Sequence, residues 1–182
     1  NFGQTLNVAD SVAGSGTDLL ISSSIKNQRV GTITKNGTGK VTLTGANVDA
    51  SAWTINAGTL EIGGSGVLQS GSYAGAIANS GTFEYNSSSD QTMSGVISGA
   101  GALVKDNTGT LTLTGANPYT GATTVSGGIL RLQGSVGFDD GLIPGTSMIT
   151  VENGAELNVA SAWNTTTDNQ VVLNGGTLNF TA

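Results

Sequence analysis

The sequence predicts an all-β fold, a right-handed parallel β-helix (β-solenoid) of roughly eight coils. Three observations predict it. The 182 residues include 29 glycines and only 2 prolines, short apolar–polar alternations are separated by turn-forming residues, and the sequence matches itself when shifted by 70 positions. No stretch has the 3.6-residue period of an amphipathic helix. With 37% apolar residues, the chain can still bury a core.

Six short segments predict strands with one buried face, because each follows a turn and alternates apolar with polar residues. They are residues 5–8, 59–62, 82–85, 129–132, 156–159 and 177–180. Strand side chains alternate between faces, so Leu60 and Ile62 share the buried face while Glu61 points away. By the same alternation we expect these inward side chains: Leu6, Val8, Val41, Leu43, Ile55, Leu60, Ile62, Phe83, Tyr85, Leu111, Leu113, Val125, Leu130, Leu132, Leu157, Val159, Leu173, Leu178 and Phe180.

The spacing of these segments predicts coils of about 20 to 28 residues. One coil cannot bury its own apolar face, so successive coils must stack in parallel at about 4.8 Å, and eight would form a rod about 40 Å long. Parallel crossovers are right-handed. We expect Gly58, Gly81, Gly128 and Gly175 to supply positive φ at coil corners. Residues 1–182 are expected to form one β-helix segment of a longer solenoid, because both ends fall in strand-like sequence without a polar cap.

Two copies of a longer unit account for the self-match. Residues 31–62 read GTITKNGTGKVTLTGANVDASAWTINAGTLEI, and residues 101–132 read GALVKDNTGTLTLTGANPYTGATTVSGGILRL. The identities include Lys35 with Lys105 and the block TLTGAN at residues 42–47 and 112–117.

Residues 99–132 closely resemble the autotransporter-associated β-strand repeat of type V secretion systems. The lysine, the TLTLTG block, the Asn-x-Tyr-Thr-Gly turn and the Gly-x-Leu-x-Leu strand occur in the order that this family shows. The upstream copy departs from the pattern at residues 48–53, where VDASAW replaces PYTGAT. The resemblance implies a β-helical passenger that is exported across the outer membrane with help from a β-barrel translocator in the parent protein. It also implies a surface stalk that assists secretion and supports adhesion.

The composition removes several other function classes. There is no histidine and no cysteine, which removes Ser-His-Asp and Cys-His catalysis as well as imidazole and thiolate metal sites. We expect no cofactor and no metal. The net charge is −6 with six scattered basic residues, which argues against binding nucleic acid. No segment approaches the roughly 20 consecutive apolar residues that span a bilayer.

The alternative function is a polysaccharide-degrading enzyme, because parallel β-helices also carry that activity. It requires carboxylates at close range, or acidic residues that hold Ca²⁺ beside a basic residue. Asp139 and Asp140, with Arg131 nearby in sequence, are the best candidates, although a solvated loop explains them as well. We therefore expect no enzyme activity.

Four aromatic residues are the candidate contact residues: Trp53, Tyr73, Tyr119 and Trp163. We expect them in turns, where aromatic rings either pack over a coil corner or stack against a sugar or a partner protein. The expected partners are a host or cell-surface protein or glycan, and a second copy of the chain through the rod sides or the open ends.

Overall fold

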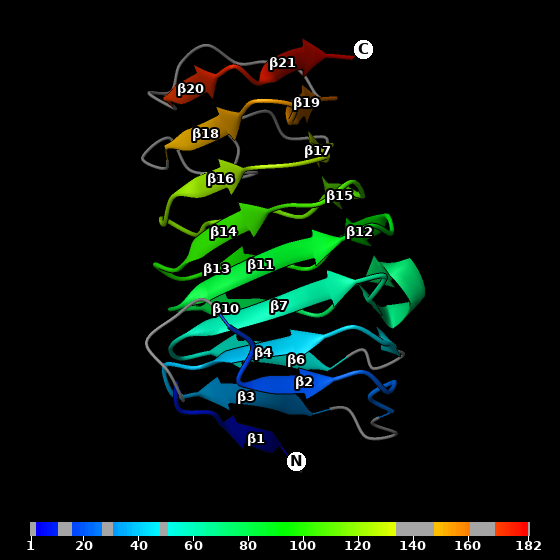
Figure 1. Ribbon diagram of the computed structural model, residues 1–182, viewed down its shortest axis with the longest axis vertical. Coiled ribbons are helices and arrows are strands. Elements are labelled where there is room, and N and C mark those ends of the chain that lie inside the picture. The colour runs from blue at the N-terminus through cyan, green and yellow to red at the C-terminus, as the bar shows by residue number, and fades with distance from the viewer. Residues whose placement is uncertain are drawn as a thin grey trace.

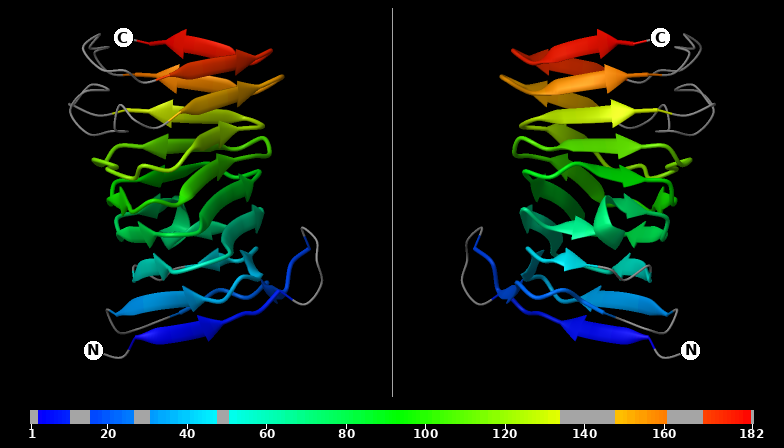
Figure 2. Two further views of the ribbon diagram at one scale, coloured as in Figure 1. Left: turned by 90° about the vertical axis from the view of Figure 1, so that its left-hand side faces the viewer. Right: turned by 90° about the vertical axis from the view of Figure 1, so that its right-hand side faces the viewer.

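The computed structural model describes residues 3–10, 16–26, 31–47, 51–133, 148–160 and 170–181. In this part of the chain, parallel strands stack coil upon coil along one axis, with the N- and C-termini at opposite ends (Figure 1). The two side views show that the sides of this stack are parallel sheets (Figure 2). The all-β solenoid prediction is therefore confirmed, while its right-handedness stays an expectation from the crossover rule.

Three sheets form the sides of the solenoid among the described residues. The eight-stranded sheet contains β2 (Leu19–Ile21), β4 (Lys40–Leu43), β7 (Thr59–Gly64), β11 (Thr82–Ser87), β14 (Ala102–Lys105), β16 (Thr123–Val125), β18 (Ile149–Glu152) and β20 (Val171–Asn174). The five-stranded sheet contains β1 (Gln4–Asn7), β3 (Thr32–Asn36), β6 (Ala52–Ile55), β10 (Ile77–Asn79) and β13 (Ile97–Ser98). The six-stranded sheet contains β9 (Ser72–Tyr73), β12 (Gln91–Met93), β15 (Thr110–Leu113), β17 (Ile129–Leu132), β19 (Glu156–Val159) and β21 (Thr177–Phe180).

Two short elements complete the described coils. β5 (Ala46–Asn47) pairs with β8 (Val67–Leu68), and one 3-10 turn, η1 (Gln69–Gly71), follows β8. The predicted number of roughly eight coils agrees with the eight-stranded sheet, whereas the other two sides have six and five strands. Within the described ranges, no helix has the length and apolar character needed to cross a membrane.

The core is a set of side-chain columns along the axis, because register places equivalent residues of successive coils next to each other. Leu43, Ile62 and Tyr85 are Cα partners in β4, β7 and β11 and have no exposed surface. Five of the six predicted strand segments lie wholly in strands, β7, β11, β17, β19 and β21, and the segment 5–8 lies in β1 except for Val8. Truncating one of the central side chains to Ala is expected to cost about 2 to 5 kcal/mol.

Five of the predicted core residues are less buried than expected. Leu173 and Phe180 are 47% and 52% exposed, and Leu6, Val8 and Leu178 are half-buried against the core. Leu173 and Phe180 face the same way as their buried partners Val151 and Val159. Their strands lie at the edges of the sheets, so no described coil covers their other side.

The prediction of positive φ at the corner glycines is confirmed for Gly58, Gly128 and Gly175, with φ of 66°, 59° and 82°. It is wrong for Gly81, whose φ is not positive. Gly81 is instead required by space, because a Cβ there would contact the carbonyl oxygen of Gly58 in the preceding coil.

Candidate functional site

Three of the four candidate contact aromatics lie in the core. Trp53 is 3% exposed and stands in β6 between its Cα partners Ile33 and Ile77. Tyr73 and Tyr119 have no exposed surface. The expectation that these residues lie in turns is wrong for Trp53 and Tyr73, which lie in β6 and β9, because both side chains are long enough to fill the interior from a strand.

The two buried tyrosine hydroxyls have partners inside the solenoid. Tyr73 donates to the carbonyl oxygen of Ser51 at 2.6 Å, and the Tyr119 hydroxyl lies 2.6 Å from Oγ1 of buried Thr123. Burial raises the pKa of Tyr119 above its ordinary value. These aromatics therefore do not form a contact surface, which corrects that prediction for Trp53, Tyr73 and Tyr119.

The remaining sequence candidates are not brought together with these residues. Trp163, Asp139 and Asp140 lie outside the described residues. Arg131 extends from β17 into the outward column of the six-stranded sheet, beside Thr112 and Asn158.

The repeat lysines Lys35 and Lys105, called here the corner lysines, are buried although alternation did not predict them in the interior. Lys35 has no exposed surface. Its Nζ donates to the carbonyl oxygens of Gly37, at the corner of its own coil (2.9 Å), and of Ala57, at the corner of the next coil (2.8 Å). Burial lowers the pKa of Lys35, and the charge of Asp18 opposes that effect.

Lys105 makes the same arrangement in the second copy. It is fully buried, and its Nζ donates to the carbonyl oxygens of Asp106 (2.7 Å), Asn107 (2.9 Å) and Gly127 (3.0 Å), the last of which belongs to the next coil. Burial lowers the pKa of Lys105 to about 8, against opposing effects of Asp106 and Asp90. The identity of Lys35 with Lys105 in the two copies was the sequence signal for this role.

A second pair of repeat residues, Asn47 and Asn117, is called here the turn asparagines. Both are buried. Oδ1 of Asn47 accepts a hydrogen bond of 2.9 Å from the backbone N–H of Ile25, and Oδ1 of Asn117 accepts one of 2.9 Å from that of Ile97. Each Nδ2 donates to the carbonyl oxygen two residues earlier. Each turn asparagine is thus hydrogen-bonded to the backbone of the preceding coil.

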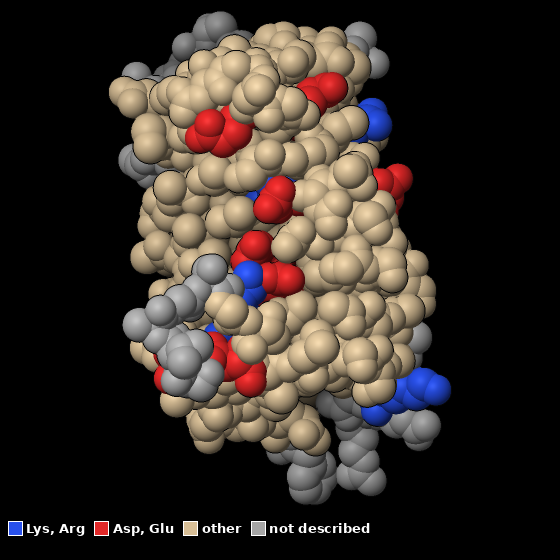
Figure 3. All heavy atoms as spheres, in the orientation of Figure 1, with Lys and Arg blue, Asp and Glu red and all other residues tan. Residues whose placement is uncertain are grey.

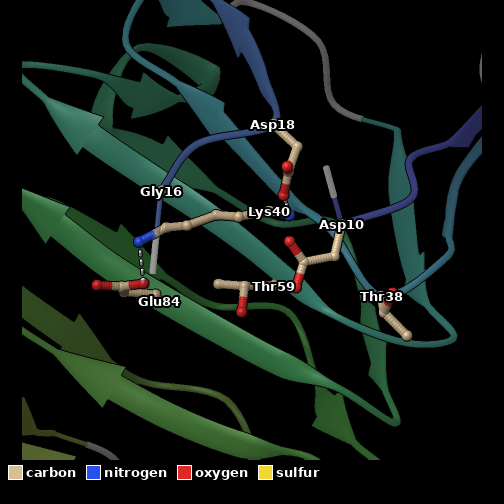
Figure 4. A pocket seen from close by; sticks show the side chains of 7 residues that line it. All are labelled: Asp10, Gly16, Asp18, Thr38, Lys40, Thr59 and Glu84. Carbon is tan, nitrogen blue, oxygen red and sulfur yellow. Dashed lines mark hydrogen bonds and ion pairs between the residues drawn. The ribbon is translucent and has the colours of Figure 1, made fainter. Parts of the chain in front are cut away.

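The outer surface carries a charged groove of about 290 Å³ over the eight-stranded sheet (Figure 4). It is lined by Asp10, Gly16, Asp18, Thr38, Lys40, Thr59 and Glu84. Lys40 pairs with Glu84 at 2.9 Å and also with Glu61. Asp18 accepts a hydrogen bond of 2.8 Å from the backbone N–H of Lys40.

The Lys40 ammonium group pairs with two carboxylates at this groove. Burial lowers its pKa, but the hydrogen bonds to Glu61 and Glu84 outweigh burial and raise the pKa above the ordinary value. Glu61 and Glu84 are both paired with this one ammonium group. On the face drawn in Figure 3, charged side chains are few, and acidic and basic groups touch one another near the middle of the face.

Comparisons with known proteins agree with this architecture. A family model described as the passenger-associated-transport-repeat matches residues 33–62 and 103–132. Over 88 residues the chain is 42% identical to "Adhesin BmaC autotransporter" of Brucella suis biovar 1 (strain 1330). In these ranges the chain is similar to autotransporter passenger sequence. The alignment covers 48% of this chain and 2% of that adhesin, so this chain spans a small part of its relative's length.

The matched repeats coincide with structural units of the solenoid. Residues 33–62 run from β3 to β7, and residues 103–132 run from β14 to β17. Both ranges contain a corner lysine and a turn asparagine. No solved structure matches this chain. Neither the comparisons nor the groove supports the polysaccharide-degrading alternative.

Proposed function

We propose that this passenger is a structural and adhesive element, a β-helical stalk that is exported across the outer membrane to the bacterial cell surface and presents its sheet faces to partners. The observation that carries the proposal is the continuous parallel register, which makes the repeats part of one rod. The parent protein supplies the β-barrel translocator, and the stalk assists secretion and carries out no chemistry of its own.

The outward column of the five-stranded sheet is the proposed contact face. Its residues are Cα partners from β1 to β13: Thr5, Thr34, Thr54, Ala78 and Ser98. All are small and uncharged, so an approaching partner avoids the repulsion that a net charge of −6 otherwise produces. Hydroxyl and methyl groups at regular spacing suit a glycan or an extended protein surface of the host.

The experiment is binding of the purified chain to an array of glycans and host-matrix proteins, with release of sugar measured in the same wells. We expect saturable binding without sugar release. Thr54→Arg, on the proposed face, should reduce binding. Thr124→Arg, which is an outward position of the eight-stranded sheet, should not. Sugar release would overturn the non-enzymatic role, and equal loss in both variants would overturn the choice of face.

A further inference from the structure

The two repeat copies have the same internal construction on different sides of the solenoid. The first copy begins in β3 of the five-stranded sheet, and the second begins in β14 of the eight-stranded sheet. In each copy, two strands joined by a corner form an arm, and a second arm stacks on the first. β3–β4 stacks on β6–β7, and β14–β15 stacks on β16–β17, all in parallel.

The corner lysines connect the two arms of their own copy. Lys35 reaches Ala57, and Lys105 reaches Gly127, with a sequence separation of 22 residues in both cases. Both ends of each bond lie inside the matched ranges 33–62 and 103–132. Because the separation and the acceptor position are identical although the sheets differ, the geometry belongs to the repeat and not to one side of the rod.

The turn asparagines connect each copy to the coil that precedes it. Asn47 accepts from Ile25, and Asn117 accepts from Ile97, and both donors lie before the first residue of the matched range. A side-chain amide can satisfy a buried N–H only if neighbouring coils are in the correct register, since an alternative register leaves polar groups unpaired.

We infer that each passenger repeat is a locally locked folding unit: its lysine holds its two arms together, and its asparagine sets the register of the preceding coil. Each repeat therefore fixes the order of its own two arms and of the coil before it. This assignment does not depend on the proposed contact face.

Physical chemistry explains why such a unit needs a lysine. At the stacked corners the backbone turns, so carbonyl oxygens of two coils point inward and cannot bond along the sheet. An ammonium group has three donors and no acceptor, which suits a group of carbonyls. An apolar residue of the same length would fill the space but would leave these carbonyls without a partner.

The test is backbone amide hydrogen exchange in the full 182-residue chain. Lys105→Met should accelerate exchange about tenfold at the corners 106–109 and 126–129, while the first-copy corners 37–39 and 57–59 keep their wild-type rates. Lys35→Met should give the reverse pattern, so each variant is the control for the other. Asn117→Ala should accelerate exchange of the Ile97 amide, and Asn47→Ala that of Ile25.

Lys26→Met, at an exposed lysine, is expected to change nothing. The inference is overturned if Lys105→Met accelerates exchange equally in both copies, or in neither. If Lys105→Met does not fold, Lys35→Met and Asn47→Ala carry the same test, because they remove fewer bonds. Array binding is a separate measurement, so loss of the contact function and loss of the local lock can be told apart.

Discussion

Glu61 and Glu84 are Cα partners on the neighbouring parallel strands β7 and β11, and their side chains leave the same face of the sheet. Like charges in this position destabilise a sheet, and here Lys40 pairs with both. Lys40→Met should therefore lower the free energy of unfolding by about 1 kcal/mol at low salt. Denaturant titration measures this change, and Glu84→Gln in the Lys40→Met background should restore part of it.

The ion pairs of Lys40 should weaken as the salt concentration rises, because salt screens exposed charges. The cost of Lys40→Met should shrink at about 1 M salt, where the Debye length is about 3 Å. An equal cost at both salt concentrations would show that Lys40 acts through packing. Lys26→Met is the matched control at an exposed lysine.

Trp53 should behave as a core residue and not as a contact residue. In a Trp163→Phe background, where Trp53 is the one remaining tryptophan, its fluorescence should be blue-shifted from that of the unfolded chain and weakly quenched by acrylamide. Trp53→Ala should lower the free energy of unfolding by about 3 to 5 kcal/mol. A stable Trp53→Ala protein that fails to bind on the array would reverse this assignment.

Alanine substitutions at two glycines with positive φ should distinguish the cost of backbone strain from the cost of a steric clash. Gly128 has φ of 59°, and a Cβ there would meet the carbonyl oxygens of Asn107 and Gly109, the latter at 2.6 Å. Gly154 has φ of 82° with nothing within 4 Å of its Cβ position. We expect Gly154→Ala to cost about 1 kcal/mol and Gly128→Ala about 2 to 4 kcal/mol in denaturant titrations. Equal costs would mean that the corner can open to admit a methyl group.

Lys105 should make stability depend on alkaline pH. Its pKa is about 8 in the folded chain, compared with 10.5 ordinarily, so between these values the unfolded chain retains a proton that the folded chain has released. Raising the pH through this window therefore stabilises the fold. Charged neighbours Asp90 and Asp106 oppose the shift, and the Tyr85 ring lies 5.9 Å from Nζ.

Tyr85 reverses the trend at higher pH. Burial raises its pKa to about 12 from 10.0, so above about pH 10 the unfolded chain loses a proton that the folded chain keeps, and stability falls. Denaturant titrations of the wild type should thus show a gain between pH 8 and 10 that is smaller in Lys105→Met, which keeps Lys35 and its lowered pKa. A gain of the same size in Lys105→Met would assign it to another group.

The apolar side chains at the C-terminal edge should promote association of the isolated chain. Leu173 and Phe180 are 47% and 52% exposed on open parallel edges, which pair readily with other strands. We expect the sedimentation coefficient to rise with concentration, and Leu173→Glu with Phe180→Glu to abolish the rise. Leu20→Glu, at a leucine that is 59% exposed on the outward face of β2, should leave it unchanged.

Alternation and self-similarity were sufficient to predict the fold and most of the core. Leu60 with Ile62 and Leu130 with Leu132 are buried as the pattern requires, because period-two alternation is a direct consequence of strand geometry. The pattern also placed Phe180 in the core, and it is half-exposed, because alternation gives the direction of a side chain and says nothing of what covers it.

The polar interior could not be derived from the same rules. Lysine is rarely buried, so Lys105 was visible only as a residue that both copies share, and its role depends on carbonyls contributed by a coil 22 residues later. Trp53 and Tyr73 were wrongly predicted to lie in turns because of the residues around them. Neighbouring Gly, Ser and Asn residues resemble turns, whereas wide core positions admit large aromatic rings.

The difference in starting side between the two repeat copies has a genetic consequence. Recombination between the two copies would join residue 32 to residue 103 and delete 70 residues, and it would preserve the bonds that Lys105 makes within the repeat. Yet β14 would then occupy the side that now holds β3, and all later strands would move to the next side of the rod. Such an exchange would shorten the passenger and also change which chemical groups each of its faces displays.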